Sequence, residues 1–145
     1  MDDELRSFMY ERAAQEGYAR KLGLTLRDLS PGRAVVEMVP RPEDTNIFGM
    51  VHGGAIFSLV DEAFQLSCNS HGTVAVALNV NMVYHNPSVQ GVALRAESRE
   101  IHRSRKTATY AIEVTDAQGV LIASCQAVAY RKRDRLPFLP DKSTG

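Results

Sequence analysis

The feature that most constrains the fold is residues 52–71, which read as one long helix, apolar over much of its surface. The run HGGAIFSLVDEAFQLSCNSH has no proline, has glycines only near its start, and is followed by the stop signal Gly72. Five small or apolar residues recur at helical spacing and share one face: Ile56, Leu59, Val60, Ala63 and Ser67. Such a helix must be enclosed by other elements of the domain.

Alternation of apolar and polar residues predicts strands around this helix. One short strand is expected over 33–39, ending at Pro40, and one helix over 2–20. After Gly72, four further strands are expected over 76–84, from 91 to about 101, over 107–115 and over 120–131. Because short turns join antiparallel neighbours, the predicted class is α+β, with a curved antiparallel sheet wrapped around one long central helix.

Composition narrows the classes of function. The 145 residues predict one domain, and 17 Lys and Arg balance 17 Asp and Glu, which gives no field to attract nucleic acid or an anionic membrane. Cys68 and Cys125 lack metal-site spacing and read as buried thiols. The acidic start and the absence of a long apolar run favour a cytoplasmic protein with no signal peptide or membrane span. The tail, 134–145, is expected to fray.

Asp61 breaks the apolar pattern of the predicted helix. On a helical wheel it lies at the edge of the apolar face beside Phe57 and Phe64, whereas Glu62 points nearly opposite. An unpaired buried carboxylate is unfavourable, so Asp61 either faces solvent, forms a structural salt bridge, or is held in a cleft as a nucleophile or general base.

The run His52-Gly53-Gly54 opens the same helix. The first N–H groups of a helix have no internal partner, so this end can polarise a carbonyl and stabilise an oxyanion. A tight turn also needs glycine, and such N–H groups can bind phosphate, although no Walker motif is present. Asp61 lies eight residues beyond Gly53, about 12 Å along a helix, so a site that uses both must be shared by two copies of the chain.

These residues resemble the signature of the hotdog-fold acyl-CoA thioesterases, within the 4-hydroxybenzoyl-CoA thioesterase superfamily and its phenylacetic-acid-degradation branch. The specific match runs from Asn46 through His52-Gly53-Gly54 and Asp61 to Gly72, and the strand pattern matches from about residue 17 to 132. The resemblance implies a single hotdog domain over 1–145. It also implies an acyl-CoA substrate, no metal or redox cofactor, and a homodimer that commonly pairs into a tetramer.

The resemblance also implies roles for individual residues. The Gly53 N–H would bind the thioester carbonyl, and Asp61 of the other subunit would activate water or attack the thioester. Asn46 would orient the water or the carbonyl, while His52 and Gly54 would shape the loop. Some relatives place a hydroxyl on the second strand where Ala77 and Leu78 stand here, so Ser67 is a candidate replacement. Phe57, Phe64 and Tyr84 are expected to line the acyl pocket, although they are equally suitable as core residues.

Basic residues gather at a predicted turn between strands. Arg99, His102, Arg103, Arg105 and Lys106 are either solvated or bind the phosphates of coenzyme A, and a second basic run, 131–133, is an alternative. Three functions follow from the sequence: an acyl-CoA thioesterase acting on aryl, arylacetyl or medium-chain esters, a non-hydrolytic hotdog binding protein or dehydratase, and a purely structural oligomer.

Overall fold

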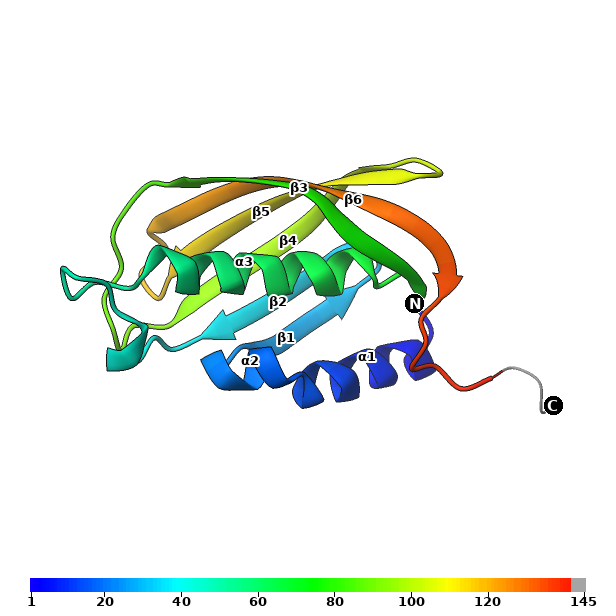
Figure 1. Cartoon of the computed structure of the whole chain (residues 1–145), viewed down its shortest axis with the longest axis horizontal. Coiled ribbons are helices and arrows are strands. Elements are labelled where there is room, and N and C mark those ends of the chain that lie inside the picture. The colour runs from blue at the N-terminus through cyan, green and yellow to red at the C-terminus, as the bar shows by residue number, and fades with distance from the viewer. Residues whose placement is uncertain (142–145) are drawn as a thin grey trace.

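A six-stranded antiparallel sheet curves around one long helix (Figure 1). The computed structural model describes residues 1–141. The helices are α1 (Asp3–Gln15), α2 (Gly17–Leu22), the short 3-10 helix η1 (Pro42–Asp44) and α3 (Gly53–Cys68). The strands are β1 (Thr25–Ser30), β2 (Arg33–Met38), β3 (Thr73–Tyr84), β4 (Leu94–Arg103), β5 (Thr107–Asp116) and β6 (Leu121–Arg135). The predicted α+β architecture is confirmed.

The order of the strands differs from the simplest expectation of neighbours joined by short turns. The sheet runs β1-β2-β4-β5-β6-β3, so β3 pairs with β6 and not with the strand that follows it. The connection from β3 to β4 instead crosses the end of the molecule where α3 begins (Figure 1). This topology leaves β3 at one edge of the sheet, next to the segment that leads into α3.

The core lies between α3 and the concave face of the sheet. α3 packs on β2, β4 and β5, and Leu59, Val60 and Ala63 are fully buried there, as the helical pattern predicted. Phe64 meets the ring of Tyr110 edge-on, with 5.5 Å between ring centroids. These contacts fix the position of the helix and therefore of both its ends.

The N-terminal region differs from the sequence prediction in two ways. The predicted helix over 2–20 is two helices, because the backbone of Glu16 is extended and interrupts the helical hydrogen bonding before Gly17. β1 was not expected, since its sequence TLRDLS does not alternate regularly and its pairing with β2 contains a bulge between Leu26 and Asp28. Pairing with β2, across the tight turn at residues 31 and 32, imposes the strand.

The first part of the tail does not fray as expected. Residues 134 and 135 belong to β6, Leu136 is buried, and the guanidinium of Arg12 lies 6.0 Å from the centre of the Phe138 ring. Residues 142–145 lie outside the described part of the chain. Within residues 1–141, no helix is long and apolar enough to cross a membrane.

Candidate active site at the start of the central helix

The first turn of α3 leaves one backbone donor free. Gly54 N–H donates to Nδ1 of His52 at 2.8 Å, and the N–H groups of Ala55 and Ile56 donate to the His52 carbonyl at 3.0 and 3.2 Å. Among residues 1–141, the Gly53 N–H has no acceptor. Because the helix dipole places partial positive charge at this end, Gly53 is the position where an incoming carbonyl oxygen finds an unused donor.

His52 is the N-cap of α3. Its Nδ1 accepts a hydrogen bond from Gly54, so in the neutral ring the hydrogen lies on Nε2. Its backbone N–H donates to the Asp44 carbonyl at 2.8 Å, which ties the start of α3 to η1. Arg41 in turn donates to the Asp44 carboxylate at 2.9 to 3.1 Å and holds the pKa of that carboxyl below its usual value. An ion pair between the partly exposed Arg41 and the buried Asp44 thus anchors the turn before Gly53.

Asn46 shapes the loop that precedes the helix. Its Oδ1 accepts from the N–H groups of Phe48 and Met50 at 2.9 and 3.2 Å, so its Nδ2 is the group left to donate outward. The loop closes through an antiparallel bridge between Thr45 and Val51. Asn46 can therefore offer a hydrogen-bond donor to a ligand while its other end keeps the loop in shape.

A cavity of about 330 Å³ lies beside the free Gly53 N–H. Ten residues line it: Asn46, Met50, Val51, Gly53, Ile56, Tyr84, His85, Asn86, Pro87 and Ser88. Tyr84, at the end of β3, donates its hydroxyl hydrogen to the Gly53 carbonyl at 2.9 Å, so the far end of β3 meets the start of α3. Burial raises the pKa of this phenol, which keeps it protonated as a donor.

Asp61 lies two turns further along α3 on a face that the described chain leaves open. Phe57, Asp61 and Gln65 are exposed at four-residue intervals. Although the Asp61 side chain reaches solvent, surrounding protein atoms partly desolvate its carboxylate and Glu16 adds negative charge, and both effects raise its pKa. α3 is continuous from Gly53 to Cys68, so the axial separation of about 12 Å between Gly53 and Asp61 stands.

Glu62 is buried, although the helical wheel places it on the side of the helix opposite Asp61. It does point away from the apolar face, but the N-terminal helices cover that side and leave it only 6% exposed, without a partner for Oε1 in residues 1–141. Tyr18 and Glu16 make the covering contacts, through hydrogen bonds of 2.9 Å to Ser58 and Gln65 respectively. Burial, followed by the charge of Glu16, raises the pKa of Glu62 to about 8.

The other expected binding residues divide into two groups. Gly54 and Phe57 are exposed at or near the start of α3. Phe64 is 1% exposed against Tyr110, and Ser67 is fully buried with its hydroxyl 2.7 Å from that of Ser98. Phe64 and Ser67 therefore do not line the cavity beside Gly53, because the apolar face they share is turned toward the sheet.

The basic residues lie far from Gly53 of the same chain. Arg103, Arg105 and Lys106 are exposed at the hairpin between β4 and β5, at the opposite end of the molecule from the start of α3 (Figure 1). Arg131 of the alternative run donates to the Ser104 carbonyl at 2.7 Å, so the two basic sets adjoin. Within one chain, Asn46, His52 and Gly53 lie close together, whereas the two basic sets lie far from them.

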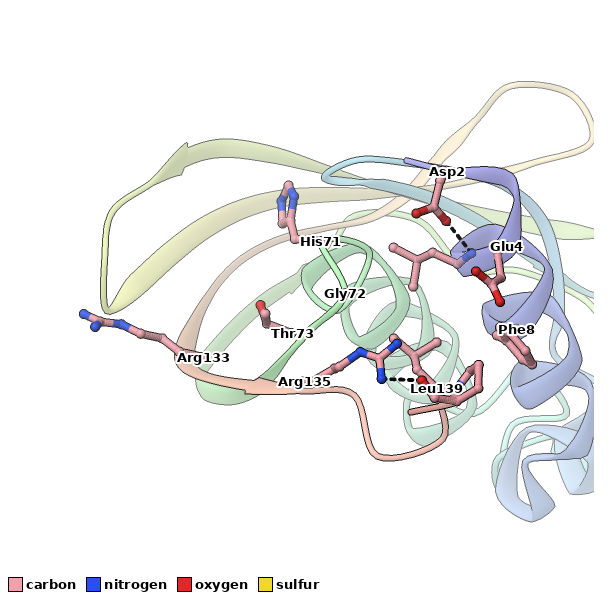
Figure 2. Close-up of a pocket in the computed structure, with 11 residues that line it drawn as sticks. Asp2, Glu4, Phe8, His71, Gly72, Thr73, Arg133, Arg135 and Leu139 are labelled. Atoms are coloured by element: carbon pink, nitrogen blue, oxygen red, sulfur yellow. Dashed lines mark hydrogen bonds between the residues drawn. The ribbon is translucent and has the colours of Figure 1, made fainter. Parts of the chain in front are cut away.

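A second cavity, of about 360 Å³, lies at the opposite end of α3 between α1 and the tail (Figure 2). Its polar groups are largely engaged with protein: Asp2 accepts from Leu5 N–H, Arg135 donates to the Pro140 carbonyl, and His71 pairs with Glu100. The Arg133 side chain points away from the other residues drawn (Figure 2). The arrangement fits a structural junction better than a reaction site.

Two features of the site were not expected from sequence. The Tyr84–Gly53 hydrogen bond and the burial of Ser88 in the same cavity both depend on the path of the chain after β3. The only sequence signal for that path is the Asn86-Pro87 break. Among the described residues, no group of three or more His, Cys, Asp or Glu is arranged to hold a metal ion.

Comparison with known proteins identifies the family. The profile described as the thioesterase superfamily matches residues 48–123, which include the start of α3 and Asp61. The chain belongs to the thioesterase superfamily. It is 36% identical over 137 residues to a putative esterase of Archaeoglobus fulgidus, covering 94% of this chain and 87% of that protein. The hotdog fold and the resemblance drawn from the sequence are confirmed.

Two further similar proteins are informative. The acyl-coenzyme A thioesterase PaaI of Escherichia coli is 33% identical over 123 residues, with 85% of this chain and 86% of that protein covered. Its solved structure, described as coming from the phenylacetic acid degradation operon, superposes with a TM-score of 0.87 over 91% of this chain and 96% of its own. A Streptococcus mutans protein solved with acetyl-CoA bound is 25% identical, with a TM-score of 0.75 over 78% of this chain and 91% of its own.

Proposed function

We propose that this thioesterase-superfamily protein is an acyl-CoA thioesterase that hydrolyses aryl, arylacetyl or medium-chain acyl-CoA to a free acid and coenzyme A. The observation that carries the proposal is the unused Gly53 N–H at the start of α3, facing a cavity that also holds Asn46. The acyl-CoA thioesterase name of the E. coli relative and the acetyl-CoA in the S. mutans protein support the same class of ligand.

In this proposal the thioester carbonyl oxygen accepts from the Gly53 N–H, with the Nδ2 of Asn46 as a second donor. Negative charge that develops on this oxygen is stabilised by the positive end of α3. His52 contributes by capping the helix, because its bond to Gly54 leaves only Gly53 free to donate. Gly54 keeps the approach open, since it carries no side chain beside that donor.

Asp61 of the partner subunit supplies the carboxylate. As a base it takes a proton from water while the water oxygen attacks the carbonyl carbon, and the proton then passes to the departing sulfur as the carbon–sulfur bond breaks. As a nucleophile it would attack the carbon directly. Its raised pKa favours the role of base, because proton affinity increases with pKa. Coenzyme A is part of the substrate, so the reaction uses no resident metal or redox cofactor.

The dimer follows from the same geometry. If Gly53 of one copy faces Asp61 of the other across a two-fold axis, the helices run antiparallel and Phe57, midway between them, lies at the axis. Phe57 is 39% exposed in the single chain, and β3 is an edge strand with exposed Val76, Leu78 and Val83. An edge of this kind needs a partner. A second copy would cover both Phe57 and the edge strand β3. Pairing of two such dimers would give the tetramer.

The proposal assigns Arg103, Arg105 and Lys106 to the phosphates of coenzyme A. In the antiparallel dimer the hairpin of one subunit lies toward the Gly53 end of the other, which offsets the separation within one chain. Arg131–Arg133 is the alternative set, since Arg131 supports the same hairpin. Charged guanidinium groups at a rim bind phosphate well, and the exposed hairpin has few acidic neighbours apart from Glu100.

Free-thiol release from a panel of acyl-CoA esters tests the function. We expect turnover by the native chain and a loss of about 100-fold or more in kcat for Asp61→Asn, with unchanged thermal stability. Asp3→Asn, the same chemical change at an exposed aspartate of α1, is the matched control. Tight binding of esters without release of thiol would contradict hydrolysis and support the non-hydrolytic binding protein. An inert Asp61→Asn would point to a structural oligomer.

A further inference from the structure

The first turn of α3 combines an open approach with little conformational restraint. Gly53 and Gly54 are the first two residues of the helix, and neither carries a side chain that would restrict its backbone. Glycine in a helix is less stable than alanine by about 1 kcal/mol, because it loses more conformational freedom on folding. An oxyanion site is effective only when its donor is already in place, so this turn needs a restraint from elsewhere in the fold.

The side chain of Tyr84 supplies such a restraint. Its hydroxyl donates to the Gly53 carbonyl at 2.9 Å, in addition to the N–H four residues further on that bonds to this carbonyl in an α-helix. The ring lies beside the Gly53 α-carbon, because a Cβ placed there would be 3.5 Å from both Cζ and the hydroxyl oxygen of Tyr84. Gly53 is therefore held at its carbonyl by a hydrogen bond and flanked at its α-carbon by an aromatic ring.

The sheet fixes the position of Tyr84. It is the last residue of β3 and pairs with Ala123 of β6. The N–H of the next residue, His85, donates to the Ile122 carbonyl at 2.8 Å, so the backbone on both sides of the Tyr84 side chain is hydrogen-bonded to β6. The side chain therefore connects the edge of a rigid sheet to the first residue of α3.

A second tyrosine contacts the same end of α3 without reaching Gly53. The Tyr18 hydroxyl lies 2.9 Å from the Ser58 hydroxyl, which itself donates to the Gly54 carbonyl at 2.9 Å. Tyr18 lines a separate cavity, whereas Tyr84 and Gly53 line the same one. Among residues 1–141, no side chain other than that of Tyr84 forms a hydrogen bond with Gly53.

We propose that Tyr84 is a positioning residue, whose hydroxyl holds Gly53 in the orientation in which its free N–H receives the thioester carbonyl. This role rests on the proposed function and adds to it a residue that no motif contains. The two glycines keep the approach to the donor clear, and the Tyr84 hydroxyl limits the movement that they would otherwise allow. Tyr84 acts through Gly53, because its hydrogen bond is to the protein and not to the substrate.

The activity of Tyr84→Phe, which loses the hydroxyl and keeps the ring, tests this role in the full-length protein. We expect kcat for an acyl-CoA ester to fall about 10-fold while KM stays within about two-fold of the native value, because a displaced donor weakens binding of the transition state. The hydrogen bond is exposed, so Tm should fall by a few degrees at most. Tyr18→Phe is the matched control, because it removes a hydrogen bond of the same length to α3, and its kcat should stay native.

Hydrogen exchange tests the restraint without any turnover. In the ligand-free protein, the Phe57 amide, which bonds to the Gly53 carbonyl in the helix, should exchange about 3- to 10-fold faster in Tyr84→Phe than in the native chain. Its exchange should be unchanged in Tyr18→Phe. Unchanged exchange or unchanged kcat in Tyr84→Phe, or an equal fall in kcat in Tyr18→Phe, would overturn the proposal. Faster exchange in a chain that hydrolyses no ester would support the restraint on Gly53 and reject only the hydrolysis.

Discussion

The polar groups at the two ends of α3 differ in whether the folded chain gives them hydrogen-bond partners. At the C-terminal end, Ser70 accepts from Gly32 N–H at 2.7 Å, and Asn69 exchanges two hydrogen bonds with Ala75. His71 there meets Glu100 at 2.7 Å. At the N-terminal end, the Gly53 N–H and the Ser88 hydroxyl are buried or half-buried and unmatched. The folded chain itself supplies the hydrogen-bond partners at the C-terminal end, whereas at the N-terminal end it leaves the Gly53 N–H unpaired.

Removing the free Gly53 N–H should reduce activity most strongly. Gly53→Pro deletes the N–H at the first helical position, where proline is well tolerated, and the extended backbone of His52 is compatible with a following proline. We expect a loss of about 100- to 1000-fold in kcat, as for loss of one oxyanion donor, with Tm unchanged. Gly53→Ala, which keeps the N–H and whose Cβ would lie 3.5 Å from the Tyr84 ring, is the control. Equal activity of the two variants would remove Gly53 from the mechanism.

Glu62 is a third case, because its Oε1 has no hydrogen-bond partner in residues 1–141 and the N-terminal helices cover it. Its pKa near 8 means that the folded chain holds a proton which the unfolded chain loses near pH 4.5. The free energy of unfolding should therefore fall as pH rises from about 4.5 to 8, by at most about 5 kcal/mol. Urea unfolding at pH 5 and pH 8 should show this slope in the native chain and a flatter one in Glu62→Gln. An unchanged slope would show that Glu62 is ionised at neutral pH.

The smallest of the three effects concerns the C-terminal end of α3, where the polar groups are hydrogen-bonded. Ser70→Ala leaves the buried Gly32 N–H without its acceptor and should reduce the free energy of unfolding by about 1 to 3 kcal/mol. The kcat of the variant at a temperature well below its Tm should equal that of the native chain. A reduced kcat in the folded variant would mean that the two ends are coupled, and the contrast between them would fail.

The sequence indicates the central helix and most of the sheet because their signals are local. The apolar spacing of Leu59, Val60 and Ala63 requires no knowledge of the partner elements, and the alternation in β5 predicts that strand almost to the residue. The break at Glu16 and the strand β1 have no equivalent pattern of apolar residues, and β1 is a strand because it pairs with the neighbouring strand β2.

For the candidate site, the motif residues and the pocket residue Tyr84 were accessible from sequence, and the rest of their surroundings was not. Asn46 and Gly53 line one cavity, with His52 adjacent to Gly53, because the three residues are close in the chain. Tyr84 and Ser88 reach them only because β3 pairs with β6 and its connection turns back across the start of α3. The burial of Glu62 likewise depends on helices that precede it by more than forty residues.

The most direct test of the shared site is a mixing experiment. Asp61→Asn and Gly53→Pro chains, each inactive alone, are unfolded together at equal concentration, refolded and assayed for thiol release. Each mixed dimer would contain one site with both native residues, so random reassociation predicts about a quarter of the native activity. Recovery to that level supports a site built from Gly53 of one subunit and Asp61 of the other. A refolded mixture as inactive as either variant alone would contradict it.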